Sequence, residues 1–496
     1  MLGSTAPQRV RDTDEIASGA RLISEESSKV EELLGEKKIR NSGVLRGALS
    51  LSLGTAGARG LSALSQVLLV VWLVPAEFGY WAAALASLSF FTSVVNFGEI
   101  NGYLAGRSSS FRRMRRTTRR MNLALTLIAM LVAVVIGFLN SWTIGVLAIW
   151  VALSIPVQGE SDVLYALGVK KNRIRRLVLS QVLAAVVKLG LGVCLAMWTQ
   201  SALAIAISTV AYYLVMILGM RAVSATLGED DGPTGESDSV TKRERISWAV
   251  NSLVMSLPLQ VGFFVAQFVT SSATLGLYYF SFQVTLGLSG LLAVPLARVS
   301  LASFGERNRS DRLILGMELS HSLAAGVMLL VAIIAIASPI AGHVLPTEWI
   351  PAIPVAVIML ASLPIRLISP VIEGFQQSDN RWWQSTAFNA VETIASASIA
   401  ASLLIVDLTM FALILTGWRL LFGVFRIVYV FQGARVGSMV GLLVAISVGT
   451  ATVSAAAIVS EPLGFIFTSG TIVGAAIWLI QGIRMRPRTV GSDLTT

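Results

Sequence analysis

The sequence predicts an all-α fold: a polytopic integral membrane protein of about 14 transmembrane helices, in two parallel six-helix lobes followed by two C-terminal helices. Composition is the first reason. Only 13% of the 496 residues are charged and 54% are hydrophobic, and the mean hydropathy is +0.74. A soluble domain normally carries about 25% charged residues. The other two reasons are the length of the apolar runs and the placement of the basic residues between them.

The apolar residues form separate runs of roughly 18 to 26 residues, long enough to cross about 30 Å of hydrocarbon as helices. Runs such as 123–138 lack the alternation that a transmembrane β-strand requires. The predicted spans are 48–74, 79–106, 121–139, 143–168, 177–198, 202–220, 246–270, 275–300, 313–338, 351–372, 384–405, 409–431, 437–459 and 463–483.

The basic residues determine the predicted orientation of these spans. Of the 38 Lys and Arg residues, all but six fall in segments on one side of the membrane, and none falls in a segment on the other side. Because cytoplasmic segments are enriched in Lys and Arg, we expect an even number of spans in the cell membrane, with both termini in the cytoplasm. The formal net charge of +10 therefore reports topology and does not indicate a nucleic-acid partner.

The predicted organisation follows from these spans. It comprises a cytoplasmic N-terminal tail (1–47), an N-lobe (48–220), a cytoplasmic linker (221–245), a C-lobe (246–431), two further spans (437–483) and a cytoplasmic C-terminal tail (484–496).

An internal repeat supports the two lobes. Segment 153–156 (LSIP) corresponds to 361–364 (ASLP), and 79–81 (GYW) corresponds to 276–278 (GLY). Because each lobe has an even number of spans, the repeats are parallel, as in the halves of some secondary transporters, and a substrate path is expected between them. The matched residues Pro156 and Pro364 are expected to kink their spans.

Charged residues deep inside the predicted spans are the functional candidates, because each costs at least about 2.5 to 3.5 kcal/mol near the centre of a bilayer. Four are cationic, Arg59, Lys188, Arg366 and Arg419, and one is anionic, Glu392. A polyanionic ligand would supply the missing negative charge, and the arginine fork suits phosphate. The predicted substrate-binding residues are these four cations and Gln158, which the repeat aligns with Arg366.

Two alternatives stay open for the charged residues. Lys188 and Arg419 could pair with acidic side chains, and Arg419 and Arg426, seven residues apart on one helix face, could form a bundle seam. The acidic residues Glu99, Glu160, Asp162 and Glu392 could bind a coupling proton or cation. Alternatively, Glu99, Glu160 and Asp162 could neutralise the basic cytoplasmic segments, and Glu392 could pair with a deep cation.

No enzyme or cofactor motif is found. The chain lacks the glycine-rich Lys-Ser/Thr loop that cradles nucleotide phosphates. Its two histidines, His321 and His343, are too far apart to indicate a metal site, and no predicted loop is long enough to carry paired catalytic carboxylates. We therefore expect no catalytic residue, no metal and no cofactor.

The segment Arg59-Gly60-Leu61 through Pro75-Ala76-Glu77-Phe78-Gly79-Tyr80, continuing to Asn96-Phe97-Gly98, resembles the opening of the polysaccharide (Wzx-type oligosaccharide) flippases. These belong to the multidrug/oligosaccharidyl-lipid/polysaccharide exporter superfamily. Segments 166–173 (ALGVKKNR) and 276–279 (GLYY) are similar to that family as well. The resemblance covers residues 44–485. Its motifs indicate the family more specifically than they indicate the transported molecule.

The resemblance implies a transporter that moves a polyprenyl-diphosphate-linked oligosaccharide from the inner to the outer leaflet by alternating access, next to membrane lipid and beside the glycan polymerase or glycosyltransferases of the same pathway. Arg59 matches a position that is cationic in the related peptidoglycan-precursor flippases. Those relatives follow it with an Arg-Asp pair where this chain has Ser65-Gln66, which argues against peptidoglycan precursor as cargo. The alternatives are a drug/cation antiporter of the same superfamily and a membrane-embedded glycan polymerase or ligase.

Overall fold

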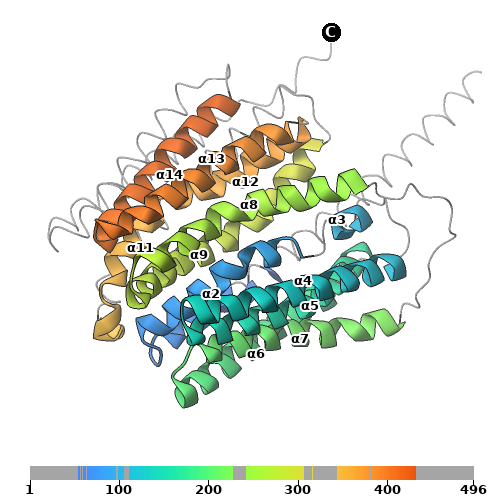
Figure 1. Ribbon diagram of the computed structural model, residues 1–496. Coiled ribbons are helices and arrows are strands. Elements are labelled where there is room, and N and C mark those ends of the chain that lie inside the picture. The colour runs from blue at the N-terminus through green and yellow to red at the C-terminus, as the bar shows by residue number, and fades with distance from the viewer. Residues whose placement is uncertain are drawn as a thin grey trace, which may run out of the picture.

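The computed structural model describes residues 54–431 apart from 56, 59, 63, 96–98, 105–110, 172, 227–241, 306–315, 317–342 and 380. Every regular element within these residues is helical, which confirms the all-α prediction. Helices α2–α7 pack together as one half of the molecule and α8–α14 as the other (Figure 1). The predicted spans 313–338, 437–459 and 463–483, both tails and nearly all of the linker lie outside the described residues.

The N-terminal half consists of α2 (Pro75–Ser93), α3 (Glu99–Leu104), α4 (Phe111–Leu139), α5 (Trp142–Lys170), α6 (Ile174–Thr199) and α7 (Leu203–Thr226). The helices α4 and α5 form a close antiparallel pair, and α7 contacts both α5 and α6. Glu77 at the start of α2 accepts a 2.6 Å hydrogen bond from the backbone N–H of Ala202, which fixes the start of α7 beside α2.

Two elements of this half differ from the prediction. Span 79–106 is divided into α2 and α3, and the sequence between them contains Asn96 and Gly98, residue types with low helix propensity. The basic segment 107–120, predicted as a connection between spans, is helical from Phe111 onward. At about 1.5 Å per residue, a helix of this length exceeds the hydrocarbon thickness, so its arginine-rich first turns extend α4 beyond the apolar layer.

The C-terminal half consists of α8 (Lys242–Val269), α9 (Ser272–Gly305), the 3-10 turns η1 (Thr347–Trp349) and η2 (Ser402–Leu404), α11 (Ala352–Leu360), α12 (Leu363–Ser378), α13 (Trp382–Ala401) and α14 (Leu408–Val430). Asp407 caps α14, because its carboxylate accepts a 3.3 Å hydrogen bond from the backbone N–H of Met410. Helix α12 contacts α9, α13 and α14, and α13 contacts α8.

The two matched prolines behave differently. Predicted span 351–372 is broken into α11 and α12, which are bent by 49°, and Pro364 is the second residue of α12, where a missing N–H is tolerated. Pro156 lies inside α5, which continues through it as one helix. Both prolines were expected to kink their spans, and the structure has a break between helices only next to Pro364.

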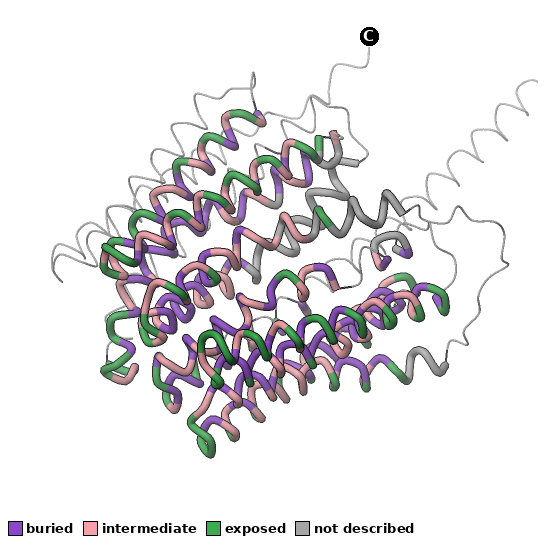
Figure 2. Tube along the Cα trace, in the orientation of Figure 1, coloured by how far each residue is buried: buried purple, intermediate pink, exposed green. Residues whose placement is uncertain are grey.

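The helices have the dimensions and surface of membrane spans. Six helices in the described part of the chain are long and apolar enough to cross a bilayer, or seven if the bent pair α11 and α12 is one span. Large apolar side chains such as Leu127, Leu131 and Phe138 of α4 are exposed, and the buried residues follow the helix faces that meet inside the bundle (Figure 2). The protein is a multi-pass membrane protein.

Backbone contact between α4 and α5 gives a first prediction. A Cβ atom added to Gly145 would lie 2.6 Å from the Cα atom of Gly137. Gly145→Ala should therefore destabilise the protein by about 1 to 3 kcal/mol through overpacking, seen as a lower thermal unfolding temperature in detergent. Gly190→Ala on α6 is the matched control, because a Cβ atom there meets no atom within 4 Å. An equal unfolding temperature for the two variants would contradict the close contact.

Candidate functional site: buried arginines of the C-terminal half

Two predicted site residues, Arg366 of α12 and Arg419 of α14, lie near one buried aromatic ring. The guanidinium carbon of Arg366 is 4.9 Å from the ring centroid of Phe282, and that of Arg419 is 5.9 Å from it. Phe282 belongs to α9 and is almost completely buried. Cation–π attraction is strongest where water is excluded, so this buried ring stabilises both cations.

The guanidinium groups of this pair are not saturated by hydrogen bonds. Both terminal nitrogens of Arg366 and the Nε atom of Arg419 are buried and have no hydrogen-bond partner among the described residues. A buried donor without an acceptor costs roughly 1 to 3 kcal/mol, and more when it is charged. An anionic group that accepts from these nitrogens would remove this cost.

One acidic residue faces the pair. Arg366 interacts electrostatically with Glu392 of α13, with Tyr278 of α9 and unfavourably with Arg419. Glu392 also interacts with Glu373, and this interaction between two carboxylates is unfavourable. The predicted acidic residue therefore lies beside a predicted cationic one, as a partial counter-ion.

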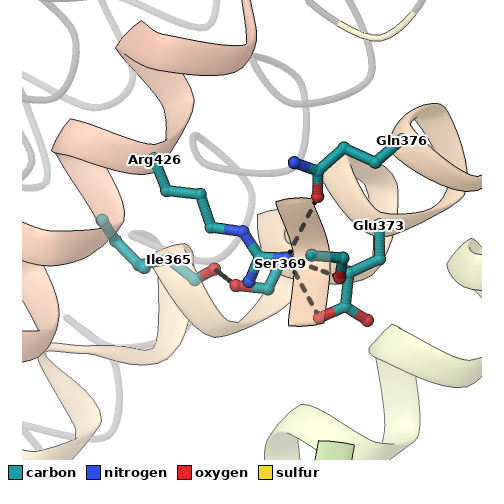
Figure 3. Close-up of polar contacts among 6 residues, drawn as sticks. Ile365, Ser369, Glu373, Gln376 and Arg426 are labelled. Atoms are coloured by element: carbon teal, nitrogen blue, oxygen red, sulfur yellow. Dashed lines mark hydrogen bonds and ion pairs between the residues drawn. The ribbon is translucent and has the colours of Figure 1, made fainter. Parts of the chain in front are cut away.

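The third arginine, Arg426, is hydrogen-bonded through its Nη2 atom, whereas its Nε atom is buried with no partner among the described residues. It lies two turns along α14 from Arg419, and its Nη2 atom donates to Glu373 at 3.4 Å, to Gln376 at 3.3 Å and to Ser385 at 3.3 Å (Figure 3). Glu373 accepts a further hydrogen bond from Asn389. Glu373 and Gln376 are on α12 and Ser385 is on α13, so Arg426 joins three helices, as the seam alternative expected.

In the N-terminal half, Lys188 of α6 donates a 3.0 Å hydrogen bond to the hydroxyl of Ser62 in the first predicted span. Arg59 lies outside the described residues. Gln158 is half-buried on α5, whereas the contacts of Arg366 are with α9, α13 and α14. The structure thus brings Arg366, Arg419 and Glu392 together and places Lys188 and Gln158 in the other half.

The remaining acidic residues lie on α3 and α5. Glu160 accepts from Arg115 of α4, with an Nε to Oε1 distance of 2.8 Å, which fits neutralisation of the basic segment. Asp162 interacts electrostatically with Tyr213 of α7, and Glu99 is a buried residue at the start of α3. Among the described residues, no group of three His, Cys, Asp or Glu residues is arranged to hold a metal ion.

Two residues beside the buried arginines, Phe282 and Glu373, were not predicted from the sequence. Phe282 carries no charge and lies in an aromatic stretch that reads as ordinary core. Glu373 is not among the acidic residues that the sequence singled out, and only its hydrogen bond with Arg426 marks it as buried counter-charge. The seven-residue spacing of Arg419 and Arg426 was the available signal, because it places both arginines on one face of their helix.

Comparison with known proteins adds the family. The model of the family described as "Polysaccharide biosynthesis protein" matches residues 68–354. The chain belongs to this family. Among curated proteins, none matches the chain.

Solved structures show the fold of this family member. The structure "Lipid II flippase MurJ, inward closed conformation" is 13% identical, with a TM-score of 0.60, and the match covers 87% of this chain and 97% of that one. The structure "Crystal structure of MATE in complex with MaL6" is 12% identical, with a TM-score of 0.51, and covers 77% and 95%. At these identities the likeness shows that the chain shares the fold of both structures.

The Arg426 network gives a second prediction. Arg426→Met should destabilise the protein by about 3 kcal/mol, because it leaves the mostly buried Glu373 without its charge partner. The double variant Arg426→Met, Glu373→Leu should recover part of this loss, since apolar replacement of a whole buried pair is tolerated. Thermal unfolding of both variants in detergent measures the difference. A double variant less stable than Arg426→Met alone would contradict the pairing.

Proposed function

We propose that the protein moves a polyprenyl-diphosphate-linked oligosaccharide from the inner to the outer leaflet of the cell membrane by alternating access. Membership of the polysaccharide biosynthesis family and the flippase-like fold support a glycan-related transporter. The observation that carries the proposal is the pair Arg366 and Arg419, whose buried nitrogens lack acceptors among the described residues. A diphosphate offers several oxygens to such a pair, and the arginine fork binds phosphate in two-point fashion.

The charge of the site distinguishes this cargo from the main alternative. A drug/cation antiporter shares the fold, but it must attract a cation. The described interior of the C-terminal half holds three arginines, Arg366, Arg419 and Arg426, against two acidic residues, Glu373 and Glu392. In a low-dielectric interior this surplus repels cations and attracts anions.

The residues of the first span also distinguish the proposed cargo from peptidoglycan precursor. Ser65 donates to the backbone of Ser62, and Gln66 hydrogen-bonds the hydroxyl of Tyr279, so neither supplies the charged pair that the peptidoglycan-precursor flippases have there. We infer a different lipid-linked glycan, with Lys188, Gln158 and Arg59 contributing from the N-terminal half. Its source and destination would be the glycosyltransferases and polymerase of the same pathway.

Substitution of Arg366 tests the proposal. Arg366→Ala removes the charged donors and should weaken binding of polyprenyl diphosphate by purified protein at least roughly tenfold, and should abolish appearance of the glycan at the cell surface. Arg366→Lys keeps the charge but loses the fork, so an intermediate loss is expected. Arg419→Ala should resemble Arg366→Ala.

Arg381→Ala is the control, because it removes a half-exposed arginine from the same half. It should leave both binding and export at the level of the parent. Normal binding and export by Arg366→Ala at normal protein level would reject the site. Uptake of a cationic dye instead of a lipid-linked diphosphate by proteoliposomes would favour the antiporter.

A further inference from the structure

The two halves touch through their backbones where α2 and α9 begin. A Cβ atom on Gly79 would lie closer than 3.0 Å to the carbonyl oxygen of Ser272, and one on Gly276 would lie closer than 3.0 Å to the carbonyl oxygen of Pro75. Pro75 and Ser272 are the first residues of α2 and α9, and each glycine follows one turn later. Each helix thus places its first carbonyl against the glycine of the other helix.

This contact is reciprocal in terms of the internal repeat. The repeat aligns Gly79 with Gly276, and the same alignment sets Pro75 opposite Ser272. A pair of equivalent contacts related in this way is the signature of a two-fold arrangement. Because the atoms that each added Cβ would meet belong to backbone, no side-chain rotation can relieve the clash.

Aromatic residues surround the glycine contact and join the halves. The indole N–H of Trp81 donates to the hydroxyl of Tyr279 at 3.1 Å, and that of Trp349 donates to the carbonyl of Leu73 at 3.0 Å. Phe78 packs edge-on against Phe280 and Trp349, with ring centroids 6.3 and 4.9 Å apart. All of these side chains are buried, so this end of the seam excludes water.

Further along α2, the seam between the halves is polar. Ser87 donates to Gln267 at 3.2 Å, and Ser256 donates to Ser93 at 2.6 Å. The Nε2 atom of Gln267 is buried with no hydrogen-bond partner in the described part of the chain. A permanent interface inside a membrane protein leaves few such groups unpaired, whereas a face that is periodically wetted gives them water as a partner.

On the proposed alternating access, this seam is the gate between the halves, and we propose that Gly79 and Gly276 are the two positions whose missing side chains allow it to close. The backbone contact with its aromatic surround seals the end of the bundle where α2 and α9 begin, which is the predicted outer end. Separation of the halves there breaks two indole hydrogen bonds and exposes Ser87, Gln267, Ser93 and Ser256 to water. The inference concerns the transport cycle and holds for any cargo.

Cysteine labelling tests the gate. Cys194 is the only cysteine and is exposed on α6, so Cys194→Ser gives a background for Ser87→Cys, which lies two turns inward of Gly79. A membrane-impermeant maleimide added outside intact cells should label this cysteine slowly. Adding Gly79→Ala or Gly276→Ala should raise the labelling rate roughly tenfold, because the closed state is penalised and its population falls.

Gly190→Ala, where the added methyl group meets no atom within 4 Å, should leave the labelling rate unchanged. Glycine variants that label no faster than the parent, at equal amounts in the membrane, overturn the proposal. Should neither glycine variant reach the membrane, Trp81→Phe keeps the ring and removes only its hydrogen bond to Tyr279. It should raise the rate about two- to threefold, and an unchanged rate for it would also overturn the gate.

A disulfide provides an independent readout. In the Cys194→Ser background, Ser93→Cys with Ser256→Cys places two thiols where the hydroxyl oxygens are 2.6 Å apart, so mild oxidation should join the halves rapidly. The same pair with Gly79→Ala should cross-link several-fold more slowly, since the closed seam is less populated. Equal cross-linking rates with and without Gly79→Ala contradict the gate. Neither readout requires the transported molecule to be known.

Discussion

A charge in the interior of a membrane bundle must be compensated, and this constraint explains the arrangement of the C-terminal half. Desolvation of an ion costs several kcal/mol, so each buried arginine must find an acid, a set of hydrogen-bond acceptors or an aromatic face. Arg426 has Glu373, Gln376 and Ser385. Arg366 and Arg419 both have Phe282, and Arg366 also has Glu392. Arg426 is therefore held by an acid and two polar side chains, whereas an aromatic ring lies beside both Arg366 and Arg419.

Much of the fold could be predicted because the hydrophobic thickness of a bilayer sets helix length. Predicted spans 143–168, 177–198 and 409–431 correspond to α5, α6 and α14 within a few residues. The division of span 79–106 and the helical start of α4 were missed, because both depend on backbone preference at helix ends and leave the apolar pattern unchanged. Pro364 was recognised as a break, whereas Pro156 was not distinguishable from it by residue type.

The sequence identified the charged residues of the candidate site, but it did not predict which side chains contact one another there. Depth in a span identified Arg366, Arg419 and Glu392, because an intramembrane charge is rare and costly. Which of them meet depends on how each helix is rotated about its axis, and this is decided by side-chain packing between α9, α12, α13 and α14. That is why Phe282 and the Glu373–Arg426 bond emerged only from the structure, and why Gln158, aligned with Arg366 in sequence, has different surroundings.

The reciprocal contact of Gly79 and Gly276 also has an evolutionary meaning. In a symmetric dimer a single substitution appears twice at the shared axis, so every improvement or defect is doubled. With both copies fused into one chain, each half mutates alone. The backbone contact must stay matched on both sides, whereas other aligned positions can differ, as Gln158 and Arg366 do. A reciprocal joint between the halves is thus compatible with different residues inside each of them.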